Sequence, residues 1–271
     1  MNVRVSSDDA HARRIEEAAL RAWPAHADTD FDGWRLRFSD GYTRRANSVT
    51  PLGTSYLAIE DKIATCERLY AERGLPAIFR LTPFAPPELD ERLATRGYRL
   101  GDRVEVRARS LLDVVPTRPR RARGALRTDA PARLGPHTRP RARAHTIESW
   151  LDIFGRLSGA PVANRPAHRA VLNAVPGVRR LLALWVNGDP VACGMCVFNE
   201  GMLGLFDLVT AVEQRRLGYG SKILRQALRW GASAGATEAY LQVLVGNTPA
   251  QRIYDREAFE VVYHYHYRER P

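Results

Sequence analysis

The stretch Thr210-Ala-Val-Glu-Gln-Arg-Arg-Leu-Gly-Tyr-Gly-Ser221 decides how this chain of 271 residues is interpreted. It follows an apolar run typical of a strand, Met202–Thr210, and precedes a stretch with apolar residues at helical spacing. Gly218 and Gly220 let the backbone turn tightly and leave room for a ligand to approach the amides. Amides at a helix N-terminus carry partial positive charge, so this turn is suited to a pyrophosphate.

The loop differs from the two common nucleotide-binding patterns. G-x-x-x-x-G-K-S/T is absent, and only two glycines have the spacing of a dinucleotide fingerprint. Arg215 and Arg216 would add charge-assisted contacts to a phosphate. Two glycines in a strand-to-helix turn are a weak signal alone, so the interpretation depends on a second motif nearer the C-terminus.

That second motif begins 27 residues after Gly220 and reads Asn247-Thr-Pro-Ala-Gln-Arg-Ile-Tyr254, followed by Ala258-Phe259. The two motifs in this order resemble those of the GNAT superfamily of acyl-CoA-dependent N-acetyltransferases, over about residues 146–268. The loop is similar to the family's R/Q-x-x-G-x-G/A, and the later segment to N-x-x-A-x-x-x-Y-x-x-x-G-F. The sequence departs from the family at Ala258 and at Arg216, where glycine is usual or frequent.

The resemblance implies acetyl-CoA as acyl donor, with direct attack of an amine on the thioester and no acyl-enzyme. The pyrophosphate would lie on the amides of Leu217–Ser221, and the pantetheine arm along Leu208–Thr210, where the family's strand splays from its neighbour. Asn247 would bind the pantetheine or its strand, and Tyr254 would protonate the leaving thiolate. The residues expected to bind acetyl-CoA are Leu208, Val209, Thr210, Val212, Arg215, Arg216, Leu217, Gly218, Tyr219, Gly220, Ser221, Asn247, Ala250 and Tyr254.

Asp207 is the first candidate for the base that takes the amine proton. It lies in an otherwise apolar strand, and a carboxylate there needs either a partner or a function. A hydrogen-bonded structural acid remains the alternative for Asp207, and a packing aromatic remains the alternative for Tyr254. Glu200 and Glu213, in turns, are weaker candidates for the base.

Two further patterns predict no metal or redox site. Cys193 and Cys196 are three residues apart in a predicted strand, where their side chains point to opposite faces. His264 and His266 share a strand face, but no third ligand has matching spacing. We therefore expect no disulfide and no metal.

The fold class expected is α/β with mixed sheets, arranged as two tandem GNAT-like domains with helices flanking each sheet. The sequence of the second half predicts helices and strands in the order α-α-β-β-β-α-β-α-β. The first half repeats the end of this order with a helix at residues 59–73, strands at 76–81 and 104–106, and a helix at 88–96. The predicted division is a degenerate GNAT-like domain at 1–115, a linker at 116–143 and the catalytic domain at 144–271.

The first half lacks the motifs that carry the chemistry. No Gly-x-Gly opens its long helix, Pro83 stands near the place of Asn247, and Leu93 takes that of Tyr254. We therefore expect it to bind no acetyl-CoA and to complete the substrate side. Its polar cluster at residues 44–48 either lines a cleft between the halves or is a solvated strand end.

Much of the formal charge of +11 is concentrated in residues 116–143, which hold nine arginines, one acid and five prolines. This composition is typical of an extended, self-repelling linker. It also leaves open nucleic acid as a partner, through an aminoacyl transferase with a tRNA-borne donor or a non-enzymatic, acyl-CoA-responsive RNA-binding protein. A mycothiol synthase-like transferase is another alternative with two such domains.

The leading hypothesis is an acetyl-CoA-dependent N-acetyltransferase acting on a small-molecule or peptide amine, as a monomer or homodimer. Three cysteines, no apolar run long enough to span a bilayer and no visible signal peptide predict a cytoplasmic protein without a membrane partner.

Overall fold

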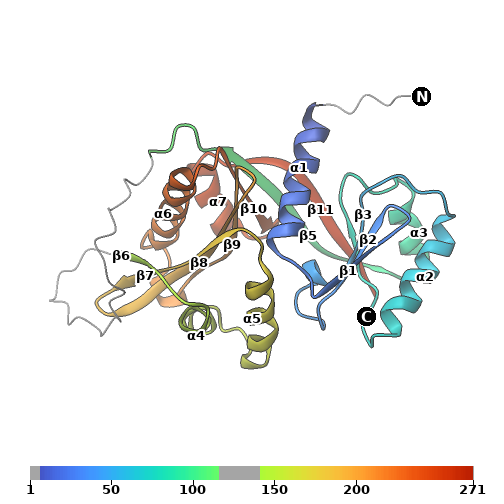
Figure 1. Ribbon diagram of the computed structural model, residues 1–271, viewed down its shortest axis with the longest axis horizontal. Helices are drawn as coiled ribbons and strands as arrows, with labels where there is room; N and C mark the ends of the chain where they lie inside the picture. Colours follow the sequence, from blue (N-terminus) through green and yellow to red (C-terminus); the bar gives the residue numbers. More distant parts are fainter. Residues whose placement is uncertain (1–6, 116–140, 271) are drawn as a thin grey trace.

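The computed structural model describes residues 7–115 and 141–270, and within them the strands form one eleven-stranded sheet (Figure 1). The strand order is β1-β2-β3-β4-β11-β5-β10-β9-β8-β7-β6, so the sheet runs through both halves of the chain. The strands are β1 (Ala27–Phe31), β2 (Trp34–Phe38), β3 (Val49–Pro51), β4 (Phe79–Leu81), β5 (Arg99–Ser110), β6 (Arg141–Ala144), β7 (Val178–Val186), β8 (Asp189–Asn199), β9 (Met202–Thr210), β10 (Glu238–Leu244) and β11 (Glu260–Glu269).

The two halves exchange their last strands. Strand β5 of the first half lies between β10 and β11, antiparallel to both, with Val106 opposite Gln242. Strand β11 of the second half lies between β5 and β4, with His266 opposite Leu81. Each half therefore completes the sheet of the other with backbone hydrogen bonds.

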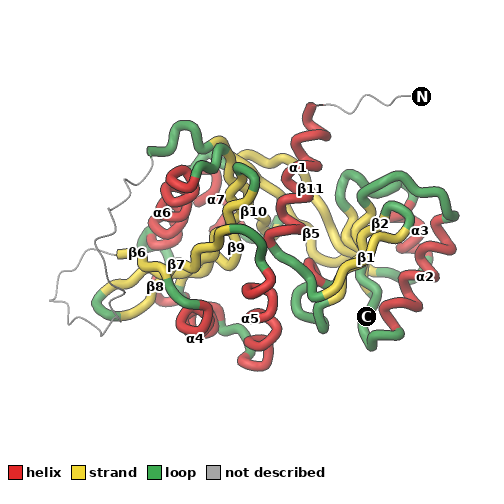
Figure 2. Tube along the Cα trace, in the orientation of Figure 1, coloured by secondary structure: helices red, strands yellow, loops and turns green. Residues whose placement is uncertain are grey.

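Helices cover both faces of the sheet, as Figure 2 shows for the pair α6 and α7 and the pair α4 and α5. Apolar residues of α1, α4 and α5 bury one face, and those of α6 and α7 bury the other. The α-helices are α1 (Ser7–Ala22), α2 (Ile59–Ala71), α3 (Leu89–Thr95), α4 (Ile147–Ser158), α5 (Arg165–Ala174), α6 (Tyr219–Ala234) and α7 (Thr248–Arg256), and the short 3-10 helices are η1 (Arg44–Ala46), η2 (Val162–Asn164) and η3 (Val212–Gln214).

The mixed α/β class and the element order of the second half are confirmed. Strand β9 has the predicted bounds, and α4 begins after Thr146, whose side chain accepts a hydrogen bond from the Ser149 amide. The first half contains more structure than predicted, since β5 spans twelve residues rather than three and α1 to β3 precede the predicted elements. The last residues of the stretch 116–143 belong to β6, which pairs with β7, while residues 116–140 lie outside the described part of the chain.

The two cysteines of β8 confirm the alternation argument. Cys193 packs in the core under α4 and α5, and Cys196 packs in the core under α6. All three cysteines are free and buried. In the parts of the chain that the structure describes, no helix has the length and apolar character needed to cross a bilayer.

A buried ion pair ties α1 to both halves. Glu16 and Arg80 are each about 1% exposed and form a two-pronged contact, and the Tyr263 hydroxyl donates to Glu16 over 2.5 Å. Burial opposes the charged form of Glu16, yet Arg80 and Tyr263 hold the pKa of this carboxyl below its ordinary value. Since Tyr263 belongs to β11, this cluster fixes the exchanged strand against the first half.

Candidate active site

The glycine loop, residues 210–221, joins β9 to α6, as predicted. Gly218 stands at the N-cap of α6 with a φ of 79°, a left-handed conformation that glycine adopts without strain. A Cβ on Gly220 would lie 3.0 Å from Ile253 Cδ1 and 3.4 Å from Thr210 Oγ1. Gly220 therefore allows the start of α6 to approach both α7 and the end of β9.

Both departures from the family pattern fall where the backbone is left-handed. Arg216 has a φ of 61° and Ala258 a φ of 57°. This conformation favours glycine, which accounts for the glycine usual in the family at these places. The turn at Ala258 still closes, because the Phe259 amide donates to the Tyr254 carbonyl over 2.9 Å.

The glycine loop, the end of β9 and helix α7 surround one cleft of about 1220 Å³. All the predicted acetyl-CoA-binding residues line it except Leu217, which is 56% exposed beside it. The expected residues that line it are Leu208, Val209, Thr210, Val212, Arg215, Arg216, Gly218, Tyr219, Gly220, Ser221, Asn247, Ala250 and Tyr254. The structure thus brings the two sequence motifs to one site.

Four arginines make this cleft electropositive. Arg215 and Arg216 were expected from the loop, whereas Arg252 and Arg256 on α7 were not. Among residues 7–115 and 141–270, no carboxylate forms an ion pair with any of the four. Arg252 and Arg256 are one helical turn apart, so their spacing could have indicated a second basic pair on the same cleft.

Strands β9 and β10 diverge beside the cleft. Their parallel pairing covers Met202–Leu205 against Glu238–Leu241, although β9 continues to Thr210. Just beyond this pairing β9 carries a bulge, since Cys193 lies opposite Val209 but Met195 lies opposite Phe206. Asp207, inside the bulge, has a φ of 52°. The extra residue turns the end of β9 away from β10, and the predicted splay is confirmed.

Tyr254 lies on α7 with its ring against Phe259 and lines the cleft. Burial raises the pKa of its phenol to about 12, while the charge of Arg107 opposes this rise. The hydroxyl therefore stays protonated at neutral pH. Asn247 caps α7, because its side-chain oxygen accepts a hydrogen bond from the Ala250 amide at 3.3 Å.

Asp207 has a partner that the sequence did not reveal. The Nε2 atom of His168, on α5, lies 3.0 Å from Asp207 Oδ2. The His168 side chain is 3% exposed and that of Asp207 17%, so the carboxylate faces the accessible side of the pair. Aromatic rings surround the imidazole with centroids 4.9–5.8 Å away: Trp23, Tyr42, Trp150 and Phe154.

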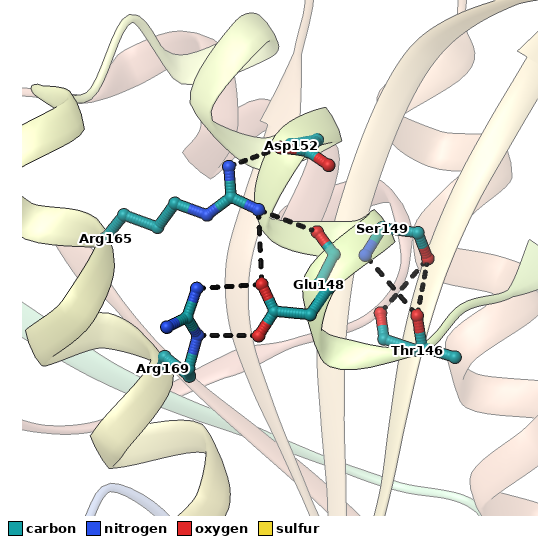
Figure 3. Close-up of polar contacts among 6 residues, drawn as sticks. All are labelled: Thr146, Glu148, Ser149, Asp152, Arg165 and Arg169. Carbon is teal, nitrogen blue, oxygen red and sulfur yellow. Dashed lines mark hydrogen bonds and ion pairs between the residues drawn. The ribbon is translucent and has the colours of Figure 1, made fainter.

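Ion pairs between α4 and α5 fix the helix that carries His168 (Figure 3). Arg169 contacts both carboxylate oxygens of Glu148, with distances of 2.6 and 2.8 Å. Arg165 bridges Glu148 and Asp152. Such exposed pairs contribute little stability singly, but together they set the position of α5 against α4.

Neither of the weaker candidates for the base lines the cleft, although the residues on either side of Glu213 do. Glu200 is in the turn between β8 and β9 and pairs with Arg21 at 2.8 Å, and Glu213 is exposed in η3. His266 lies 2.7 Å from Asp90, and His264 lies 3.9 Å from Glu105. In the described residues no group of three or more His, Cys, Asp or Glu side chains could hold a metal ion.

Comparison with known families agrees with this geometry. The model of the acetyltransferase (GNAT) family matches residues 147–259, the segment that holds the whole cleft. Residues 147–259 form an acetyltransferase (GNAT) domain. A second family model, described as the C-terminal region of the probable histone acetyltransferase Rv0428c, matches residues 9–100.

Two relatives cover most of the chain. The uncharacterized N-acetyltransferase YobR of Bacillus subtilis is 26% identical over 259 residues, which are 94% of this chain and 97% of the relative. The probable histone acetyltransferase Rv0428c of Mycobacterium tuberculosis is 30% identical over 242 residues, which are 86% of this chain and 66% of the relative.

Solved structures share the fold over both halves. The match to a GCN5-related N-acetyltransferase from Kribbella flavida covers 96% of this chain and 95% of that protein, with a TM-score of 0.67 and 18% identity. The match to a tandem GNAT protein from the clavulanic acid biosynthesis pathway covers 94% of this chain and 87% of that protein, with a TM-score of 0.55 and 12% identity. The chain is thus an acetyltransferase of the acetyl-CoA-dependent type, and these findings do not favour the mycothiol synthase-like, tRNA-dependent or RNA-binding alternatives.

Proposed function

We propose that the second half of the chain transfers an acetyl group from acetyl-CoA directly to an amine of a small molecule or peptide. The observation that carries this proposal is the single cleft in which the glycine loop, the diverging end of β9 and Tyr254 meet. The acceptor would reach the thioester from the side of Asp207.

The cleft offers a contact for each part of the donor. The amides of Leu217–Ser221, at the start of α6, would hold the pyrophosphate, and the four cleft arginines would add charge-assisted contacts. The pantetheine arm would lie along Leu208–Thr210, beyond the point where β10 pairs with β9. A backbone N–H at that edge would polarise the thioester carbonyl.

The chemistry consists of one bond formed, one broken and a balanced proton transfer. The neutral amine nitrogen attacks the carbonyl carbon, and the C–S bond breaks. Asp207 accepts a proton from the amine, held by His168 in the required orientation. Tyr254 donates a hydrogen bond to the leaving sulfur. A thiol of pKa ~8.5 is a stronger acid than this phenol, so full proton transfer to sulfur needs the proton that the amine releases.

We also propose that the first half serves the acceptor side and binds no acetyl-CoA. In this proposal the units 1–115 and 144–271 are joined by residues 116–143 and share one sheet through their exchanged strands. A cytoplasmic location and a monomeric or homodimeric state remain predictions of the sequence.

The test is release of the CoA thiol from acetyl-CoA in the presence and absence of a panel of amines. The proposal predicts amine-dependent release together with an acetylated amine detected by mass spectrometry. Hydrolysis of acetyl-CoA at the same rate with and without every amine would contradict it.

A further inference from the structure

A loop of the first half lies beside the His168–Asp207 pair. This acceptor loop, residues 39–47, connects β2 to β3 and contains η1. The Tyr42 ring on this loop lies 5.4 Å from the His168 ring. A segment far from the second half in sequence therefore contacts the histidine that pairs with Asp207.

The acceptor loop is held in one conformation by Asn47. The side-chain nitrogen of Asn47 donates to the carbonyls of Tyr42 and Thr43, each at 2.9 Å. Its side-chain oxygen accepts from the amides of Ser39 and Gly41, at 2.7 and 3.1 Å. Asn47 is 3% exposed, so these bonds are formed in the interior.

This conformation is a strained one. Asp40, Gly41 and Thr43 have φ values of 50°, 76° and 58°, and a β-branched residue such as Thr43 is disfavoured there. Trp23 Nε1 donates to Thr43 Oγ1 over 3.0 Å and helps to hold it. Strained backbone that the surroundings maintain in this way is concentrated at functional sites.

Two opposite charges lie around the half-buried Tyr42. Burial and then the Asp207 carboxylate raise the pKa of the Tyr42 phenol, while the Arg45 guanidinium lowers it. The phenol is thus near enough to both charges to be influenced by each. Arg45 also lies over the ring of Phe206, the residue next to Asp207, at 5.5 Å.

Arg45 has no carboxylate partner in the described parts of the chain, although it is half-buried. Its neighbour Arg44 contacts both Asp102 and Glu269. The Arg45 guanidinium instead lies over the rings of Trp23 and Phe206, 5.1 and 5.5 Å from their centroids, which leaves its N–H groups available to an anion.

We propose that the acceptor is an amino-acid-like molecule that carries a carboxylate close to the reacting amine. This inference rests on the proposed function. Asp207 receives the amine, Arg45 binds the carboxylate through charge-assisted hydrogen bonds, and Tyr42 packs against the body of the acceptor. The first half therefore selects the substrate, while the second half supplies the donor and the chemistry.

The wild-type protein provides the first experiment. Acetyl-CoA is kept saturating, and kcat/KM is measured for the common amino acids, their amides and the corresponding decarboxylated amines. The inference predicts at least one amino acid whose kcat/KM exceeds those of its amide and amine by about tenfold or more. It is overturned if no carboxylate-bearing amine is accepted, if amides serve equally well, or if only a lysine side chain within a peptide is acetylated.

Substitution of Arg45 provides the second experiment. Arg45→Gln is expected to raise KM for the preferred amino acid by about 10–100-fold and to leave KM for its amide unchanged. Arg45→Lys should retain part of the preference, and Arg44→Gln all of it. Equal effects on acid and amide would mean that Arg45 only packs against Trp23 and Phe206, and would overturn the inference.

The proposed function is checked separately by calorimetry with acetyl-CoA. Retained acetyl-CoA binding and amine acetylation without a preference for carboxylates would overturn only this inference. Loss of acetyl-CoA binding in the wild type would overturn the proposed function itself. If Arg45→Gln fails to fold, the inference is still tested by comparing kcat/KM of the wild-type protein for an amino acid and for its amide.

Discussion

The Nε2 atom of His168 lies 3.0 Å from Oδ2 of Asp207, and this contact joins helix α5 to the bulge in β9. The bulge stands where β9 leaves β10, next to the cleft proposed for the donor. A buried imidazole donating from Nε2 would hold the carboxylate in one orientation, with its other oxygen free for the acceptor. His168 is thus a positioning residue, and Asp207 is the group proposed to touch the amine.

Asp207→Asn tests the assignment of the base. The amide keeps the shape of the carboxylate but cannot accept the amine proton, so kcat/KM should fall by about 10²–10⁴-fold. The dissociation constant for acetyl-CoA should stay unchanged, since Asp207 does not line the cleft. Steady-state kinetics and calorimetry on one preparation check both.

The matched variant is His168→Gln, which removes the imidazole from the same contact. It should lower kcat, by less than Asp207→Asn does, and leave KM for acetyl-CoA unchanged, because the carboxylate remains as the base but is no longer held by the imidazole. A wild-type kcat together with reduced stability would show that His168 has only a structural role.

Tyr254→Phe tests the hydrogen bond to the leaving sulfur. The substitution removes one hydroxyl and keeps the ring against Phe259. We expect kcat to fall by about 10²-fold or more, with acetyl-CoA binding retained. Ionisation of Tyr254 should cause no fall in the wild-type pH–rate profile below about pH 11, because burial raises the pKa of this phenol to about 12. A Tyr254→Phe enzyme as active as the wild type would remove Tyr254 from the mechanism.

Stability should fall at alkaline pH. Burial raises the pKa of Tyr254, Tyr240 and Tyr70 above the ordinary value of ~10. Below pH ~10 these phenols are protonated in both the folded and the unfolded protein, so they do not make the free energy of unfolding depend on pH. Above it, the unfolded chain loses protons that the native protein retains, so the free energy of unfolding decreases as pH rises.

Urea unfolding followed at pH values from 8 to about 11 checks this prediction, with tyrosinate absorbance recorded in parallel. The tyrosinate signal should appear largely together with unfolding. A free energy of unfolding that stays constant to about pH 11, with phenols ionising in the folded protein, would contradict the assigned burial.

Expression of the halves as separate chains tests the strand exchange. Residues 144–271 alone would leave β10 and β11 without β5 between them, and residues 1–115 alone would leave β4 and β5 without β11. Unpaired strand edges promote association, so each fragment should be aggregated or poorly structured. Co-expression should restore a folded heterodimer, judged by circular dichroism and gel filtration. A stable, monomeric 144–271 fragment that binds acetyl-CoA would argue against the need for the exchange.

The second half could be predicted well because its signals are local. The apolar run of β9, the turn residues before it and the two motifs around α6 and α7 each specify their own backbone conformation. Helix α1 also had a local signal, with Asp8 and Asp9 in its first turn and Ala12, Ile15 and Ala19 on one face.

The remaining features depend on contacts between distant residues. Strand exchange pairs Val106 with Gln242, and no local pattern encodes that choice. His168 lies on the buried face of α5 with Val171 and Leu172, and a polar residue there indicates some partner without naming it. The folded acceptor loop brings Tyr42 to His168 and Arg45 to Phe206, and no local sequence pattern predicts these contacts.

Calorimetric titration with acetyl-CoA tests the central claim most directly, using wild type, Gly218→Trp and Gly235→Trp. Both glycines have positive φ values, +79° and +95°, and a Cβ at either meets no atom within 4 Å, so the two variants carry similar backbone strain. Gly218 lines the cleft, whereas Gly235 caps the opposite end of α6. We predict one acetyl-CoA per chain for wild type and Gly235→Trp, and none for Gly218→Trp. Wild-type affinity in Gly218→Trp, or no binding by the wild type, would contradict the account.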